Sequence, residues 1–374
     1  MDFLQTIVSF SLGTLVPFLF VLTVVVFFHE LGHFQVARWC GVKVDAFSVG
    51  FGPEIFGWTD RQDTRWKVCW VPLGGYVKFH GDAGAASMPD TEKLERMAAD
   101  GAMREVFHFK PLWQRAAVVA AGPIANFILA ILIFAAIFMT AGQRTTPAQV
   151  DEIVPGSAAE AAGLRAGDIV REINGRKMRN FSDLQRLVST SAEVPLRMVV
   201  DRSGTILEVT AVPAREEITD ANGTTHKIGV LGVKRQTEEA DWTHERYSAP
   251  VALWKGVEET GFVIERTLNY VGRLIVGQES ADQLGGPIKI AQVSGQAADI
   301  SFLALINLAA VLSVSIGLIN LFPIPLLDGG HLAYYSYEAV AGRPMSEKAQ
   351  EIGFRIGFAF VVMLMLFATW NDIT

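Results

Sequence analysis

The chain has 374 residues, of which 50% are hydrophobic and 19% are charged. This composition is too apolar for an ordinary soluble protein and too charged for a chain that lies entirely in a membrane, so we expect a membrane protein with a folded aqueous part. The net charge of −7, without a basic cluster, argues against nucleic acid as a partner.

Four apolar segments come close to the roughly 20 residues that a helix needs to cross a bilayer. They cover residues 4–28, 116–139, 302–321 and 352–370. We do not expect the first to be a cleavable signal peptide, because it follows Met1-Asp2 without a basic residue and exceeds the usual apolar core of such peptides. The sequence therefore predicts four membrane spans.

His29, Glu30 and His33 stand at the end of the first span in the pattern His-Glu-x-x-His. Residues four apart on a helix differ by about 40° in direction and about 6 Å in rise, so both imidazoles can hold one metal ion. In zinc peptidases the carboxylate of this pattern takes a proton from the attacking water. Ionisable groups in a span are energetically costly when unpaired, which favours a functional role, although a helix end at the polar interface would also tolerate them.

Residues 42–79 alternate apolar and polar positions between glycines and prolines, which predicts strands over residues 46–53, 66–71 and 75–79. The strands are aromatic and follow the metal-binding pattern directly. We interpret them as a sheet at the bilayer surface, with an ordinary cytoplasmic sheet as the alternative. Residues 81–100 are small and polar, which favours a mobile connector. Cys40 and Cys69 lie between the first two spans. The lysines and arginines of this segment place it in the cytoplasm, where we expect free thiols.

The second span contains Gly122, Pro123 and Asn126. Proline kinks a helix and small residues let neighbouring helices approach closely. The amide of Asn126 needs a partner in an apolar segment, and a hydrogen bond between helices is favoured over a direct functional role.

Residues 143–240 form the one segment with an aqueous composition. It resembles a PDZ domain of the type found in bacterial proteases, because Pro155-Gly156-Ser157-Ala158-Ala159, Gly163-Leu164, Gly167-Asp168 and Ile173-Asn174-Gly175 occur in that family's order. Residues 228–233 are a plausible closing strand. Residues 250–298 then repeat apolar side chains at three- and four-residue steps, which predicts one amphipathic helix along the outer surface.

A catalytic zinc site needs a third protein ligand. Asp328 follows the third span, whose helix must end at Pro323 and Pro325. The first and third spans run in the same direction, so Asp328 reaches the depth of the two histidines. His331 is a rival ligand, and a capping role for Asp328 in a glycine-rich turn is the structural alternative.

Together these motifs resemble the site-2 protease family of intramembrane zinc metalloproteases, most closely its bacterial sigma-E-regulating branch. The shared elements are His29 to His33, residues 72–78, Gly122-Pro123 with Asn126, the PDZ-like segment and residues 320–330. The resemblance implies Zn²⁺ bound by His29, His33 and Asp328, Glu30 as the general base, Asn320 as a residue that positions substrate or the intermediate, and Gly74, Gly75, Tyr76 and Val77 on a hairpin that holds substrate as a strand. The best-known relatives in this branch carry two tandem PDZ domains, whereas this chain has room for one.

The predicted fold is a multi-span α-helical membrane protein with four transmembrane helices, a membrane-associated β-hairpin region and one α+β PDZ-like extracytoplasmic domain. Lysines and arginines between the first two spans, and Arg343 and Lys348 between the last two, place those loops in the cytoplasm. Both termini and the PDZ-like domain are then periplasmic, and the active site faces the cytoplasmic side of a bacterial inner membrane. The predicted segments are 1–38, 39–111, 112–142, 143–240, 241–300, 301–335 and 336–374.

The predicted function is cleavage of single-span membrane proteins in the lipid bilayer, after another protease has removed their external parts. The resemblance implies anti-sigma factors or residual signal peptides as substrates. The PDZ-like domain would filter substrates by size or read exposed C-termini. Two alternatives are an inactive PDZ-bearing scaffold with a structural metal and a metal-ion transporter. Glu30 argues against the scaffold, and ionisable groups gathered at one depth argue against the transporter.

Overall fold

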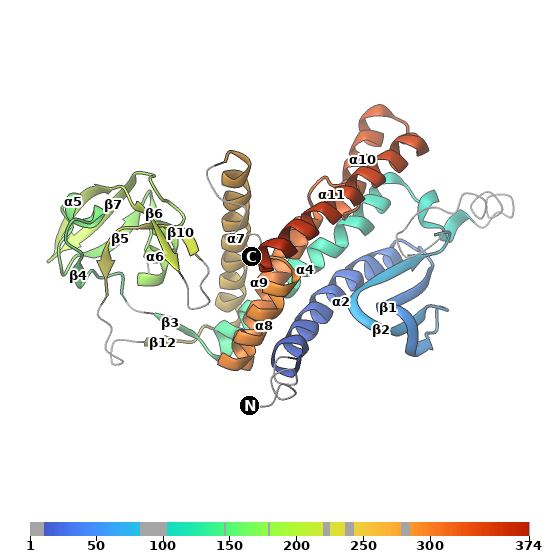
Figure 1. Ribbon diagram of the computed structural model, residues 1–374, viewed down its shortest axis with the longest axis horizontal. Coiled ribbons are helices and arrows are strands. Elements are labelled where there is room, and N and C mark those ends of the chain that lie inside the picture. Colours follow the sequence, from blue (N-terminus) through green and yellow to red (C-terminus); the bar gives the residue numbers. More distant parts are fainter. Residues whose placement is uncertain are drawn as a thin grey trace. The chain divides into compact units, whose positions relative to one another are not determined.

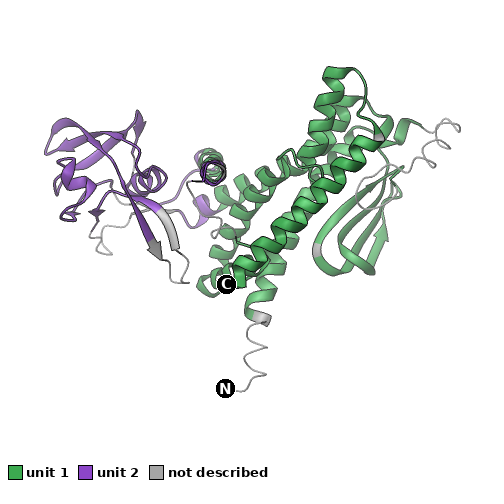
Figure 2. Ribbon diagram, turned by 45° about the horizontal axis from the view of Figure 1, so that its top comes forward, with its two compact units in different colours: residues 1–136, 253–267, 284–374 green, residues 137–252, 268–283 purple. Residues whose placement is uncertain are grey.

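A computed structural model describes residues 11–82, 103–145, 147–178, 180–219, 225–235, 243–277 and 285–373 (Figure 1). The chain forms two compact units (Figure 2). The first comprises Met1–Ala136, Leu253–Thr267 and Leu284–Thr374, and the second comprises Ile137–Ala252 and Leu268–Gln283. The first unit carries the long apolar helices and the second is rich in strands.

Within the described part of the chain, four helices of the first unit are long and apolar enough to cross a membrane. They are α2 (Val16–Trp39, after a π-helical turn Ser11–Leu15), α4 (Leu112–Thr140), α9 (Phe302–Asn320) and α11 (Glu347–Ile373). The four predicted long apolar helices are confirmed, except that residues 4–10 of the first lie outside the described residues. Helix α2 continues to Trp39, so His29 and His33 lie within the helix and not at its end.

The hairpin region consists of β1 (Val44–Thr59) and β2 (Arg65–Phe79), which pair in antiparallel fashion. Phe47 in the first half of β1 faces Trp66 on one side and Val77 on the other, and Trp66 also faces Trp58. The two long strands therefore bend into four segments in the order 75–79, 44–51, 65–71, 54–59. The three predicted strands are confirmed, and residues 54–59 add a fourth. Segment 75–79 is an outer strand of this sheet.

Aromatic packing joins this sheet to α2. Phe34 of α2 makes edge-on ring contacts with Phe47, at 5.5 Å between centroids, and with Trp66, at 5.1 Å. Phe47 and Val77 are buried in the same cluster. Burial of large rings is strongly stabilising, so the sheet is fixed against the helix that carries the two histidines. Most of the predicted connector, residues 83–100, lies outside the described residues, and short 3₁₀ turns follow at Met103–Glu105 and Phe107–Phe109.

The second unit is built on a sheet with strand order β6-β5-β7-β8. Its core includes Ile173, Leu184, Leu196 and Met198, all at most 1% exposed. A short helix covers Ala158–Ala161, and a strand over Ile169–Ile173 ends just before Asn174-Gly175. The predicted closing strand is interrupted at Leu231-Gly232, because Gly232 adopts a left-handed conformation with φ of 78°. The elements are β3 (Gln143–Thr145), β4 (Glu152–Ile153), α5 (Ala158–Ala161), β5 (Ile169–Ile173), β6 (Arg176–Lys177), α6 (Phe181–Ser189), β7 (Leu196–Arg202), β8 (Thr205–Ala211), β9 (Ala214–Thr219), β10 (Thr225–Val230), β11 (Val233–Lys234) and β12 (Thr243–Glu245).

The prediction of one amphipathic helix over residues 250–298 is wrong. The segment contains α7 (Ala249–Ile275) and α8 (Pro287–Ile300). Helix α7 stops before Gly277, whose φ of 72° is left-handed, and a proline starts α8. Helix α8 packs against α2 and α9, so it belongs with the membrane helices and does not lie along an outer surface. The loop predicted between the last two spans also contains a helix, α10 (Asp328–Ala341).

Candidate metal centre

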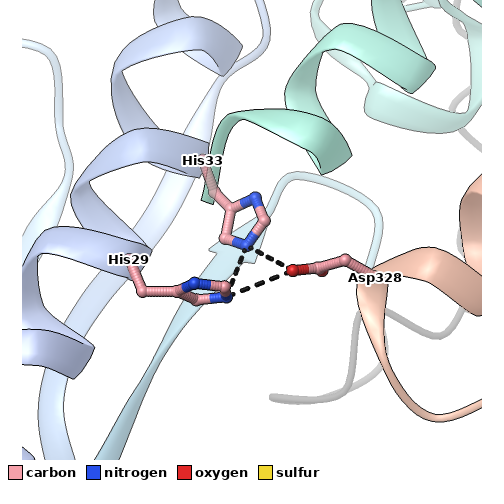
Figure 3. Close-up of side chains that lie close together, drawn as sticks. All are labelled: His29, His33 and Asp328. Carbon is pink, nitrogen blue, oxygen red and sulfur yellow. Dashed lines mark hydrogen bonds and ion pairs between the residues drawn. The ribbon is translucent and has the colours of Figure 1, made fainter. Parts of the chain in front are cut away.

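His29, His33 and Asp328 bring one atom each to a small triangle (Figure 3). The two Nε2 atoms are 3.2 Å apart, and Asp328 Oδ2 lies 3.2 Å from Nε2 of His29 and 3.5 Å from Nε2 of His33. Tetrahedral zinc with bonds of about 2.0–2.1 Å holds its ligand atoms about 3.3–3.4 Å apart. The three side chains therefore fit a zinc ion without rearrangement, and they supply the number of protein ligands that catalytic zinc sites have.

Helix geometry and a backbone reversal bring these ligands together. His29 and His33 are one turn apart on α2, while Asp328 is the first residue of α10, after the segment with Pro323 and Pro325 that follows α9. Gly330 lets this segment fold back closely, because a Cβ there would lie 2.6 Å from Pro325 Cα. The prediction that Asp328 reaches the two histidines is confirmed.

Helix α4 covers the two imidazoles from one side. Nδ1 of His33 lies 2.9 Å from the carbonyl oxygen of Val118, and Nδ1 of His29 lies 3.2 Å from the side-chain nitrogen of Asn126. A Cβ on Gly122 would lie 2.5 Å from His33 Cε1 and 2.9 Å from His29 Cε1. The predicted interhelical hydrogen bond of Asn126 is confirmed. Because a carbonyl can only accept, His33 carries its proton on Nδ1, which leaves the Nε2 lone pair for a metal.

Glu30 lies beside the outer strand segment 75–79. The backbone N–H of Val77 donates to its carboxylate, and a Cβ on Gly75 would lie 3.3 Å from Glu30 Cγ. Tyr76 stacks on Phe51, with ring centroids 6.0 Å apart. The strand thus runs directly alongside the carboxylate next to the ligand triangle.

Comparison with known proteins identifies the family. The profile described as Peptidase family M50 matches residues 17–364. The chain belongs to peptidase family M50. A protein of Agrobacterium fabrum named as a zinc metalloprotease is 48% identical over 374 residues, covering 100% of this chain and 99% of the relative. Metalloprotease MmpA of Caulobacter vibrioides is 43% identical over 380 residues, covering 96% of this chain and 95% of the relative. The chain is therefore a zinc metalloprotease, and the resemblance to site-2 proteases is confirmed.

Other predicted site residues of this M50 peptidase lie on α9, β2 and α10. Asn320 is the last residue of α9, and its role in positioning substrate stays a prediction. Gly74 has a φ of 121°, and a Cβ there would lie 2.7 Å from the Phe51 ring. His331 lies on α10 outside the triangle, and no other trio of metal-binding side chains comes together in the described part of the chain. His331 is thus not needed to complete the ligand set.

The sequence did not reveal what Val118 and Gly122 contribute to the M50 site. Val118, Gly122 and Asn126 follow each other at four-residue steps on α4 and so share one face of the helix. A signal was present, since a glycine and an asparagine at helical spacing in an apolar segment mark a face in close contact with another helix. Nothing in the sequence indicated that the contact was with the histidine rings.

Proposed function

We propose that His29, His33 and Asp328 hold the catalytic zinc of this M50 peptidase and that Glu30 is the general base. The triangle of 3.2, 3.2 and 3.5 Å edges carries this proposal. Bound zinc would polarise the scissile carbonyl and acidify the attacking water. Glu30 takes the water proton and passes it to the leaving amine, and the Val77 N–H holds its carboxylate in place.

We further propose that the substrate is a single-span membrane protein that binds as an extended strand beside segment 75–79. A transmembrane helix hides its peptide bonds in internal hydrogen bonds, so cleavage requires local unwinding. An outer strand offers replacement hydrogen bonds to the unwound chain. Gly74, Gly75, Tyr76 and Val77 lie on β2. Gly75 has no side chain that would stand between the strand backbone and Glu30.

The proposed setting is a bacterial inner membrane, with both termini and a PDZ-like second unit on the periplasmic side. The order of elements in that unit supports the PDZ-like assignment: a short helix α5, a Gly167-Asp168 turn, strand β5 and the longer helix α6. The distribution of lysine and arginine supports the orientation. Anti-sigma factors or residual signal peptides, trimmed first by another protease, are the proposed substrates.

Zinc content and cleavage of a reconstituted single-span substrate test the catalytic assignment. Glu30→Gln should keep its zinc and lose about 10²- to 10⁴-fold in turnover, since general acid–base catalysis contributes that much. Asp328→Ala should lose zinc, whereas the control His331→Ala should keep it. Wild-type turnover in Glu30→Gln would reject the proposed mechanism. Absence of cleavage by every variant and by wild type would favour the scaffold alternative. Undiminished zinc in Asp328→Ala would require another third ligand.

A deletion tests the proposed filter. Removal of residues 150–233 should allow cleavage of substrates whose external domains are intact, because the obstacle to their entry is gone. The same deletion should leave cleavage of a trimmed substrate unchanged, which serves as the control. Selectivity equal to that of the full chain would contradict filtering by this unit.

A further inference from the structure

The side chain of Asn126 raises a chemical question at the ligand triangle. Asn126 is 0% exposed, and its Nδ2 lies 3.2 Å from Nδ1 of His29. Its Oδ1 is buried without a hydrogen-bond partner among the described residues. An unpaired buried acceptor costs about 1–3 kcal/mol, so its occurrence calls for an explanation.

The orientation of this amide decides which nitrogen of His29 carries the proton. If Nδ2 donates to Nδ1, the neutral imidazole has its proton on Nε2, and that nitrogen cannot bind a metal. A half-turn of the amide exchanges its oxygen and nitrogen. Oδ1 then accepts from Nδ1–H, the buried oxygen gains a partner, and the Nε2 lone pair faces His33 and Asp328.

His33 provides an internal comparison. Its Nδ1 donates to the carbonyl oxygen of Val118, which can only accept. Val118 and Asn126 lie on the same face of α4, two turns apart, with Gly122 between them. One face of α4 thus contacts Nδ1 of both imidazoles. A hydrogen-bond acceptor at each Nδ1 keeps the proton there and leaves the lone pair of each Nε2 available to a metal.

We propose that Asn126 is a positioning residue: its Oδ1 accepts the Nδ1–H of His29 and thereby fixes His29 Nε2 as a zinc donor. This role rests on the proposed zinc ligands. Partners that orient a metal-bound histidine typically contribute about 10- to 100-fold to metal affinity. Asn126 touches neither the metal position nor the reacting water in this arrangement and acts only through His29.

Zinc affinity of the purified full-length protein, measured by competition with a chelator, tests the proposal. Asn126→Leu keeps the branching of the side chain and removes the acceptor, so its dissociation constant should rise about 10- to 100-fold. Asn126→Asp can only accept, so it should bind zinc at least as tightly as wild type. Ser313→Ala is a matched control, because Ser313 Oγ donates to the Asn126 backbone carbonyl at 2.8 Å and does not engage the ring. Its affinity should not change.

The two Asn126 variants separate the two amide orientations. Aspartate keeps an acceptor and lacks the Nδ2 donor, so zinc binding by Asn126→Asp as weak as that by Asn126→Leu would overturn the proposal. Wild-type affinity in Asn126→Leu would also overturn it. The absorption bands of bound Co²⁺ should shift in Asn126→Leu and not in Ser313→Ala. If Asn126→Leu does not fold, the zinc affinity of Asn126→Asp still tests the proposal. Full zinc binding in Asp328→Ala would reject the ligand set itself, whereas loss there with no effect at Asn126 would reject only this role.

Discussion

Replacement of Gly122 by alanine is the sharpest test of how α4 meets the metal centre. The new Cβ would lie 2.5 Å from Cε1 of His33 and 2.9 Å from Cε1 of His29. Carbon atoms in contact prefer about 3.5–4.0 Å, so the overlap with the nearer ring is about 1 Å. To relieve it, the helices must separate or the imidazoles must turn away from Asp328.

The neighbouring packing leaves little room for separation. A Cβ on Gly32 of α2 would lie 2.7 Å from Ala125 Cβ and 2.8 Å from the carbonyl carbon of Ala121 on α4, so the two backbones already touch. Overpacking of this kind costs about 1–3 kcal/mol. A displacement of about 1 Å at a catalytic group can reduce turnover about 100-fold. We therefore expect Gly122→Ala to lower both zinc affinity and turnover by about 100-fold.

The assay compares chelator competition and cleavage rate in wild type, Gly122→Ala and Gly261→Ala. Gly261 lies within α7, and a Cβ there would meet nothing within 4 Å. Gly261→Ala therefore makes the same chemical change without overlap and should keep zinc and turnover, with a slight gain in helix stability. Gly122→Ala with wild-type zinc affinity and turnover would refute the placement of both imidazoles beneath this glycine.

Three further predictions concern other contacts. Gly75→Ala places a methyl group 3.3 Å from Glu30 Cγ and 2.7 Å from the Ser48 carbonyl oxygen, so turnover should fall while zinc content stays at the wild-type level; loss of zinc would contradict this reading. Burial would raise the pKa of the Asp168 carboxyl, but hydrogen bonds from Arg202 at 2.8 Å and from the Arg165 N–H lower it. Its stabilisation is therefore complete above pH about 4 and is lost as pH falls through the lowered pKa. Asp168→Asn should destabilise the second unit at pH 7 by about 1–3 kcal/mol, measured by hydrogen exchange in β5 and β7, and the gap from wild type should shrink in acid. Asp372 accepts the N–H groups of Gly286, Ile288 and Lys289 at 2.8–3.0 Å, so Asp372→Ala should destabilise the start of α8 by about 0.5–2 kcal/mol and raise exchange there; protection equal to wild type would argue against this cap.

Much of the first unit can be predicted from local sequence. Long apolar runs predict helices of spanning length in any tertiary context, and the four expected helices are present. The pattern of His29 and His33 fixes a shared helix face, and Pro323 and Pro325 predict that α9 ends before Asp328. These features depend on residues close together in the chain, which is why pattern and spacing were sufficient.

Errors arose where the outcome depends on distant contacts. The periodic pattern of residues 250–298 continues past Gly277, so it could not show that α8 packs among the membrane helices. Residues 54–59 lack clear strand alternation, yet they pair with the first half of β2 and extend the sheet. The pairing of β1 with both halves of β2 is likewise a long-range property.

Local sequence is enough to predict the apolar helices, the zinc-peptidase pattern and the third candidate ligand, because hydropathy, helical periodicity and proline sterics act within a few residues. Which atoms meet depends on the tertiary structure. It set the triangle of His29, His33 and Asp328, placed Gly75 and Val77 beside Glu30, and laid one face of α4 on both imidazoles. Such contacts depend on how α2, α4 and the hairpin pack, and packing is fixed only when side chains from distant segments fit together at close range.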